Sequence, residues 1–221
     1  MRYNISMSKI NVMITNANGK LDNLISTIDE AVHNAETFAF EHLGIDWDID
    51  VLVTDCLYDI IIPEDGVGGR AVSHDFIELS INAEKVTGDA ISEMLVHELC
   101  HAARWGKNNE WANTLFDNLI CEGLATNFEA QYVKDKGNRQ FFLDTVLSRS
   151  EEDNQKIINQ LQPLFDSTNY DYNQIFFSGS DQLPRWAGYS AGYYLVNKYL
   201  ESTGKTIEDS FADKYSLFRE H

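Results

Sequence analysis

Residues 97–101 have the types and the spacing of a zinc-binding motif. They read HELCH, which fits the pattern H-E-x-x-H. If this segment is helical, His97 and His101 project from one face, so both imidazoles can reach one metal ion. Glu98 flanks the same face without filling a coordination site, and a carboxylate there can take a proton from water that the metal activates. The alternative is a chance motif, in which both histidines are merely partly buried and hydrogen-bonded.

A catalytic zinc site needs a third protein ligand. The metzincin pattern H-E-x-x-H-x-x-G-x-x-H is excluded, because Arg104 and Lys107 stand where it requires glycine and histidine. The remaining candidate for the third ligand is a glutamate on the next helix. Glu122 lies 21 positions after the last histidine of the motif. A turn of the chain would set that helix antiparallel to the first, and Gly123 and Ala125 would permit their close approach.

Apolar neighbours indicate that the part of the helix around Glu122 is largely buried: Leu119, Ile120, Leu124 and Phe128. A buried carboxylate needs a partner, and a cation is a suitable one. A carboxylate on the protein surface is the alternative. We therefore predict one zinc ion per chain, bound by His97, His101 and Glu122.

Apolar spacing predicts the elements that must position these side chains. Alternation of polar and apolar residues predicts strands, and apolar residues three and four apart predict helices. The predicted strands cover residues 9–14, 47–54 and 71–82. The predicted helices cover residues 20–43, 89–105, 112–136, 138–149, 151–166, 185–202 and 206–217, with a long irregular loop over 167–183.

This order of elements predicts an α+β fold. A small mixed sheet with one helix, in a βαββ order, precedes a mainly helical C-terminal half. No linker rich in proline, glycine or serine is visible, so we expect one domain over residues 1–221. Within it, an N-terminal lobe covers about residues 1–88 and a helical lobe about residues 89–221.

The motifs HELCH and EGLA together resemble those of the gluzincin metallopeptidases. More closely, the chain is similar to a small bacterial family of zinc-dependent proteases whose function is mostly inferred. The resemblance covers about residues 50–200, through GVGGRAVSHDFIELSIN, HELCHAAR, LICEGLA and AGYSAGYYLV in this order. It implies that His97, His101 and Glu122 are ligands, that Glu98 is the general base, and that a peptide or protein is the substrate.

The resemblance also bears on two neighbouring features. It implies that strand 71–82 pairs with the substrate backbone by strand addition, the alternative being a strand without an exposed edge. The thermolysin-type pattern has an acidic residue four positions after the ligand glutamate, where it supports a ligand histidine. Thr126 stands there instead, followed by Asn127, so these weaker acceptors are the candidates for that support.

A zinc peptidase also profits from a hydrogen-bond donor aimed at the oxyanion of its tetrahedral intermediate. In the segment PRWAGYSAGYYLVNKYL, a helix entered at Pro184, Gly188 and Gly192 form a smooth stripe and two tyrosines lie on an adjoining face. We predict Tyr189 as the catalytic donor. Tyr193 is the alternative, as is a packing role for both residues.

Composition narrows the possible partners. The formal net charge is −18, and an acidic surface repels phosphate groups, so we expect neither nucleic acid nor a membrane surface as partner. The N-terminal segment lacks the apolar core of a signal peptide. The three cysteines, Cys56, Cys100 and Cys121, lack the spacing of a disulfide framework, which favours a reducing, cytoplasmic location. The oligomeric state is not predicted.

Two alternative functions remain open at this point. One is a non-hydrolytic metalloprotein, such as a di-iron site built from paired E-x-x-H motifs on two helices. The other is a peptide-binding protein that keeps an idle metal site, against which the presence of Glu98 argues, because structural zinc needs no base.

Overall fold

The computed structural model describes residues 9–55, 61–108, 110–134, 136 and 139–220. Cys56 and the first eight residues of the N-terminal segment lie outside this range. The chain forms two compact units, Met1–Gly106 and Lys107–His221. The first unit contains both the sheet and the helix with the H-E-x-x-H motif. The single domain, with its lobe boundary at about residue 88, stays a prediction.

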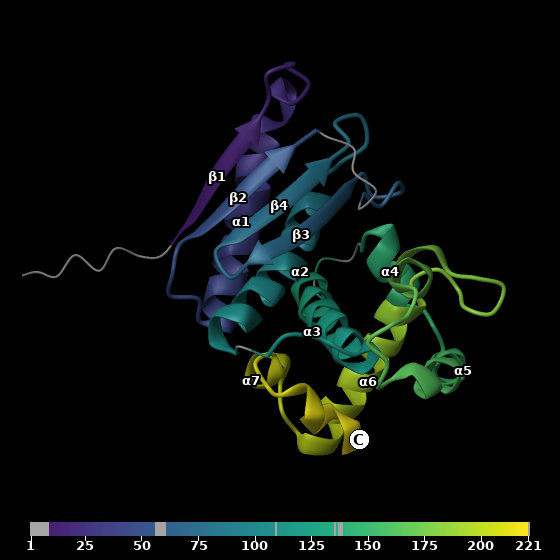
Figure 1. Cartoon of the computed structure of the whole chain (residues 1–221). Coiled ribbons are helices and arrows are strands. Elements are labelled where there is room, and N and C mark those ends of the chain that lie inside the picture. The colour runs from purple at the N-terminus through teal and green to yellow at the C-terminus, as the bar shows by residue number, and fades with distance from the viewer. Residues whose placement is uncertain (1–8, 56–60, 109, 135, 137–138, 221) are drawn as a thin grey trace, which may run out of the picture. The chain divides into compact units, whose positions relative to one another are not determined.

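The first unit contains a four-stranded mixed sheet with the order β1-β2-β4-β3. β1 (Ile10–Thr15), β2 (Ile49–Thr54) and β4 (Phe76–Ile81) are parallel to one another, and β3 (Val67–Ser73) pairs antiparallel with β4. Helix α1 (Ile25–Leu43) makes the crossover from β1 to β2, as a parallel pair requires. The strand β3 therefore lies at one edge of the sheet (Figure 1).

The prediction of one strand over residues 71–82 is wrong, because this segment turns at His74 and Asp75. The turn separates β3 from β4, and Ala71 pairs with Ile77 across the hairpin. The Ser73 hydroxyl donates a 2.6 Å hydrogen bond to the Asp75 carboxylate within the turn. The N-terminal half is accordingly βαβββ and not βαββ, while the α+β class is confirmed.

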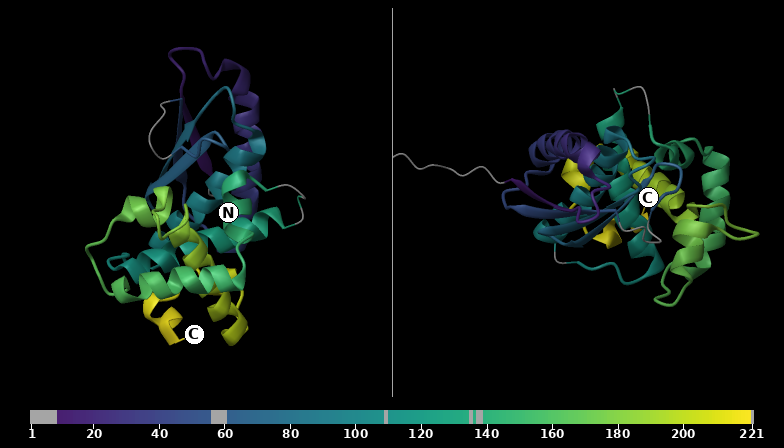
Figure 2. Two further views of the ribbon diagram at one scale, coloured as in Figure 1. Left: turned by 90° about the vertical axis from the view of Figure 1, so that its right-hand side faces the viewer. Right: turned by 90° about the horizontal axis from the view of Figure 1, so that it is seen from above.

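Two helices cover the same face of this sheet, α1 and α2 (Gly88–Lys107), as Figure 2 shows from the side. Apolar side chains of alternating strand positions form the core beneath them: Ile49, Val51, Val53, Ile77, Leu79 and Ile81. Helix α1 ends at Gly44, whose φ of 57° lets its N–H bond to the Phe40 carbonyl. The sheet and its core thus provide a rigid support for α2.

The second unit is helical, as the sequence predicts. Its elements are α3 (Leu115–Val133), α4 (Phe141–Leu147), α5 (Glu151–Leu161), the short turns η2 (Gln162–Leu164) and η3 (Gln174–Ser178), α6 (Ala187–Thr203), α7 (Ile207–Ser210) and η4 (Tyr215–Glu220). The single helix predicted over residues 206–217 is wrong, because α7 ends after one turn.

Helices α3 and α6 make the closest helix contact in this unit. A Cβ atom on Gly192 would lie 2.0 Å from the Leu119 carbonyl oxygen, and one on Gly123 would lie 2.3 Å from the Gly192 carbonyl. Of the glycine stripe predicted at residues 188 and 192, Gly192 therefore allows close approach of another helix, whereas Gly188 makes room for the Phe176 side chain of η3. Gly123, however, faces α6, whereas the sequence suggested that it faces the motif helix.

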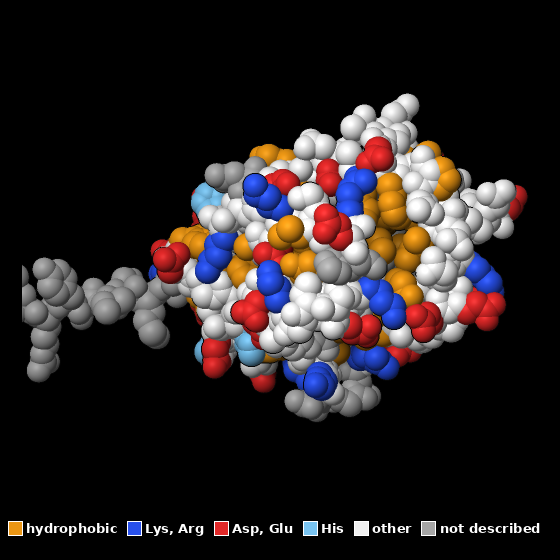
Figure 3. All heavy atoms as spheres, turned by 90° about the horizontal axis from the view of Figure 1, so that it is seen from below, with side chains coloured by type: hydrophobic (Ala, Val, Ile, Leu, Met, Phe, Trp, Pro, Cys, Tyr) orange, Lys and Arg blue, Asp and Glu red, His pale blue; other side chains and the backbone are white. Residues whose placement is uncertain are grey.

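Charged side chains of both signs are interspersed on the face drawn in Figure 3, with apolar groups between them. The described residues include exposed ion pairs, such as that of Lys198 with Glu151 at 3.1 Å. Among the described residues, no helix combines the length and the apolar character needed to cross a bilayer. The cytoplasmic location stays a prediction.

Candidate metal centre

Helix α2 presents both histidines of the motif on one face. The helix begins with a cap, because the Thr87 hydroxyl accepts a 3.1 Å hydrogen bond from the Ala90 N–H. His97 and His101 are one turn apart, and their ring centroids lie 5.0 Å from each other. Both side chains are buried, at 5% and 7% exposure. The local geometry of α2 therefore supplies two imidazoles to one small volume, as the spacing predicts.

Glu98 lies against the edge strand β3. Its Oε2 accepts a 2.6 Å hydrogen bond from the backbone N–H of Ala71. A Cβ on Gly69 would lie 2.6 Å from Glu98 Cγ, so only glycine at this strand position leaves room for the carboxylate. The sequence does not indicate this contact, because residues 69 and 98 are far apart in the chain. The carboxylate is thus held by strand backbone and not exposed to bulk solvent.

Glu122 is presented by α3, whose start is fixed by a capping box. The Thr114 side chain accepts from the Asp117 N–H, and the Asp117 side chain accepts from the Thr114 N–H. Glu122 itself is half-buried. Its Oε1 accepts a 3.3 Å hydrogen bond from the hydroxyl of Tyr172. Burial and, next, the negative charge of Glu122 raise the pKa of the Tyr172 phenol.

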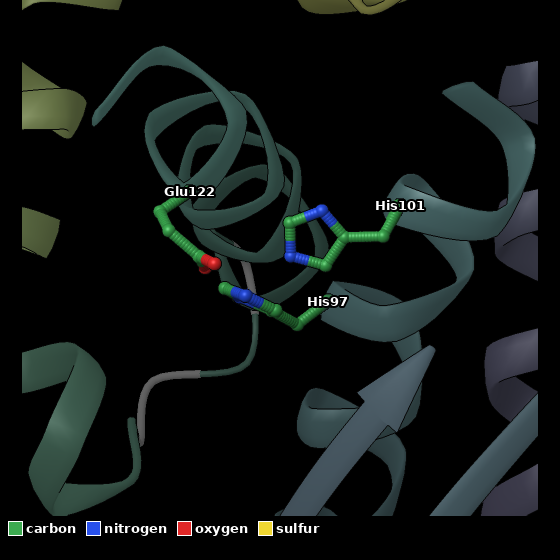
Figure 4. Close-up of side chains that lie close together, drawn as sticks. All are labelled: His97, His101 and Glu122. Atoms are coloured by element: carbon green, nitrogen blue, oxygen red, sulfur yellow. The ribbon is translucent and has the colours of Figure 1, made fainter. Parts of the chain in front are cut away.

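One potential ligand atom from each of His97, His101 and Glu122 lies within 4.8 Å of the other two. Figure 4 shows the three side chains pointing toward one another. Two imidazole nitrogens and one carboxylate oxygen are a donor set of catalytic zinc sites. Donors bound tetrahedrally at about 2.1 Å lie about 3.4 Å apart, so modest side-chain rotation would bring this group to zinc geometry. The residues present therefore fit a zinc ion.

The two residues suggested as supports for a ligand histidine have other hydrogen bonds. The Thr126 hydroxyl donates to the Glu122 carbonyl at 2.8 Å. The Asn127 amide donates to the carbonyls of Gly123, at 2.8 Å, and Tyr193, at 3.3 Å. These bonds stabilise α3 and its contact with α6. Within the described hydrogen bonds, neither side chain supports an imidazole.

Tyr189 lies in the first turn of α6, which begins at Ala187 and not at Pro184. Its ring packs edge-on against Phe142, Phe176 and Phe177, with centroid distances of 4.9, 5.6 and 6.2 Å. The catalytic role of Tyr189 stays a prediction, as does the alternative for Tyr193. The structure adds Tyr172 to the candidate site. Its contact with Glu122 was not predictable, because no short-range pattern connects this residue of the 167–183 loop with Glu122.

Three further residues close in the chain to the predicted ligands are buried. Arg104 is 1% exposed, and a buried guanidinium requires an acceptor inside the protein. Cys100 and Cys121 are buried thiols without a disulfide. Buried thiols of this kind pack as small apolar residues.

Comparison with known proteins points to the same chemistry. Residues 25–219 match the family model described as "Predicted Zn-dependent protease (DUF2268)". This match covers α2, α3, α6 and the segment that carries Tyr172. Neither the curated proteins nor the solved structures include a significant match.

Proposed function

This chain belongs to the predicted Zn-dependent protease (DUF2268) family, and on this basis we propose that it is a gluzincin-like zinc metallopeptidase. The observation that carries the proposal is the convergence of His97, His101 and Glu122, with Glu98 directly beside the first of them in α2. In this proposal the three converging residues hold one zinc ion. Glu98 is the general base and later the general acid.

When bound, zinc would act as a Lewis acid on the scissile carbonyl and would lower the pKa of a bound water to about 7. The remaining chemistry belongs to Glu98. Its carboxylate accepts one proton from the attacking water as the water oxygen forms a bond to the carbonyl carbon. The protonated Glu98 then gives this proton to the nitrogen of the leaving amine as the C–N bond breaks, which returns Glu98 to its starting state.

The hydrogen bond from Ala71 suits Glu98 to this work. Glu98 is 6% exposed, and its Oε2 is held by the strand N–H. A fixed carboxylate loses little freedom when a substrate arrives, and fixed groups contribute most to proton transfer. Glu98 is not one of the three proposed ligands. Its replacement should therefore abolish hydrolysis while zinc stays bound.

The edge strand β3 is our candidate for substrate binding. It ends the sheet on the side next to Glu98, so its outer backbone groups can pair with an extended peptide. A bridge from Ile62 to Val67 occupies the beginning of this edge, and the Ala71 N–H is already used by Glu98. The substrate backbone would therefore pair near Gly69, beside the general base.

We further propose Tyr189 as the donor to the oxyanion. Its ring contacts Phe176, which in turn stacks on Tyr172, the hydrogen-bond partner of Glu122. This packing supports a location in the neighbourhood of the metal ligands. A purely structural role in the aromatic cluster is the competing interpretation.

The chain contains a second E-x-x-H sequence, from Glu30 to His33. Its surroundings argue against a di-iron site. It lies on α1, and the His33 side chain is 75% exposed, beside Glu36 at 4.0 Å. Among the described residues, this histidine does not join a cluster of potential ligands. An idle peptide-binding protein is the remaining rival.

Metal analysis and a peptidase assay on the same preparation test the proposal. We expect about one zinc per chain and cleavage of a mixed peptide library, detected by mass spectrometry. A chelator should abolish cleavage and added zinc should restore it. Two irons per chain, or a zinc-loaded protein that cleaves no peptide in the library, would contradict a peptidase.

A further inference from the structure

We propose that Tyr172 is a positioning residue for the metal centre, which holds the carboxylate of Glu122 in place through its hydroxyl. This inference rests on the proposed function, because it takes Glu122 to be a zinc ligand. The residue acts through Glu122 and does not itself contact the ion.

The contact that carries the inference joins the Tyr172 hydroxyl to Glu122 Oε1 at 3.3 Å. A carboxylate has two oxygens, so one can accept a hydrogen bond while the other is offered to a metal. Such a partner restricts rotation of the carboxylate and so orders it for binding. Partners of this kind typically contribute 10- to 100-fold to metal affinity. Because 3.3 Å is long for an O–H···O bond, we expect the lower end of this range.

The ring of Tyr172 is held by stacking. It stacks on the ring of Phe176, with the centroids 4.4 Å apart and the planes inclined by 22°. Phe177 lies beside it at 5.9 Å. Although 37% of Tyr172 is exposed, these contacts fix the direction in which its hydroxyl points.

Phe176 in turn is anchored in the core of the helical unit. It is fully buried and belongs to a cluster that includes Leu119, which is one turn before Glu122 on α3. Gly188 of α6 makes room for the phenyl ring, since a Cβ there would lie 2.6 Å from Phe176 Cδ1. The five-residue π-helical turn η3 carries Phe176, and the Asp171 carboxylate caps it by accepting from the Gln174 N–H at 2.9 Å. The hydroxyl is thus placed by the same core that places Glu122.

The experiment compares zinc dissociation constants by chelator competition. Tyr172→Phe keeps the stacked ring and removes only the hydroxyl. The matched control is Tyr194→Phe, which breaks another tyrosine–glutamate hydrogen bond, from Tyr194 to Glu151 at 2.9 Å, in the same unit. We expect Tyr172→Phe to weaken zinc binding about 10-fold. Tyr194→Phe should leave it unchanged, and both variants should melt at similar temperatures in the presence of chelator.

A double-mutant cycle shows whether the effect passes through Glu122. In a Glu122→Ala background, the further change Tyr172→Phe should not alter zinc affinity, because the carboxylate is already gone. A wild-type protein that binds zinc, with a Tyr172→Phe variant of equal affinity, would overturn the inference and leave the proposed function intact. Equal losses in both backgrounds, or an equal loss in Tyr194→Phe, would overturn it as well. A wild-type chain that binds no zinc would overturn both proposals.

Discussion

The Oε2 atom of Glu98 lies 2.6 Å from the backbone nitrogen of Ala71, which donates it a hydrogen bond. This contact joins the helix of the H-E-x-x-H motif to the edge strand of the sheet. In the proposed reaction, this contact therefore fixes the position of the proton acceptor relative to the strand that pairs with the substrate. Disturbing either side of the contact should affect hydrolysis more than metal binding.

Replacing Glu98 should remove hydrolysis and keep zinc. Glu98→Gln retains an oxygen that can accept from the Ala71 N–H, but an amide cannot take a proton from water. We expect kcat to fall by about 10²–10⁴-fold with about one zinc still bound per chain. Turnover and metal content measured on one preparation check this. Near wild-type turnover would rule out the general-base role.

Adding a methyl group at Gly69 should displace Glu98. The new Cβ of Gly69→Ala would lie 2.6 Å from Glu98 Cγ and 2.8 Å from its Oε1, so the side chain must move. A displacement of about 1 Å can reduce the rate on the order of 10²-fold, and we expect such a loss in kcat with zinc retained. In a Glu98→Gln background the same change should cost little more, because no base remains to be displaced. A fully active Gly69→Ala variant would contradict the positioning of Glu98 by this strand.

Removing the third ligand should deplete zinc. Glu122→Ala leaves two histidines, and we expect well under one zinc per chain after dialysis. The control is Glu110→Ala, because the Glu110 carboxylate accepts from the Tyr215 N–H at 2.8 Å and so has a structural role. Glu129 is a poorer control, since it is 2% exposed and its replacement would disturb the interior. Full zinc content in Glu122→Ala would show that another group is the ligand.

A side chain at Gly192 should destabilise the helical unit. The Cβ of Gly192→Ala would lie 2.0 Å from the Leu119 carbonyl oxygen, so α3 and α6 must separate. Overpacking of this kind typically costs 1–3 kcal/mol, and a clash with backbone places our expectation at about 3 kcal/mol. Thermal or denaturant unfolding measures it. Glu201→Ala on the same helix, which breaks only an exposed pair with Lys198 at 3.5 Å, should change stability far less.

The hydroxyl of Tyr189 should matter for the rate and not for the metal. Tyr189→Phe keeps the ring that packs against Phe142 and Phe176. If the hydroxyl donates to the oxyanion, we expect kcat to fall roughly 10²–10³-fold with zinc content and melting temperature nearly unchanged. Tyr193→Phe is the comparison variant. Full activity in Tyr189→Phe with a loss of activity in Tyr193→Phe would make Tyr193 the oxyanion donor. Full activity in both variants would show that another residue is the donor.

Features that depend on neighbours within a few residues were predictable from the sequence. The spacing of His97 and His101 places them on one helical face, because a turn of α-helix has a fixed length. The apolar periods of α1, α2, α3 and α6 predict these elements to within a few residues. Glu122 was found by its context on the following helix. Local backbone geometry and the burial of one helical face explain these successes.

Features that depend on distant partners were decided by tertiary structure. The hairpin between β3 and β4 was missed because Ser73, His74 and Asp75 contain no glycine or proline to mark the turn. Gly123 could not be assigned to α6, nor Gly69 to Glu98, because a glycine shows that a close approach is possible but not which element approaches. The hydroxyl of Tyr172 reaches Glu122 only because Phe176 and the core beneath it fix the ring. The sequence alone determined which side chains could bind a metal, since that follows from residue type and helical period. Which groups hold those side chains was decided by packing between segments far apart in the chain, for which a single sequence contains no periodic signal.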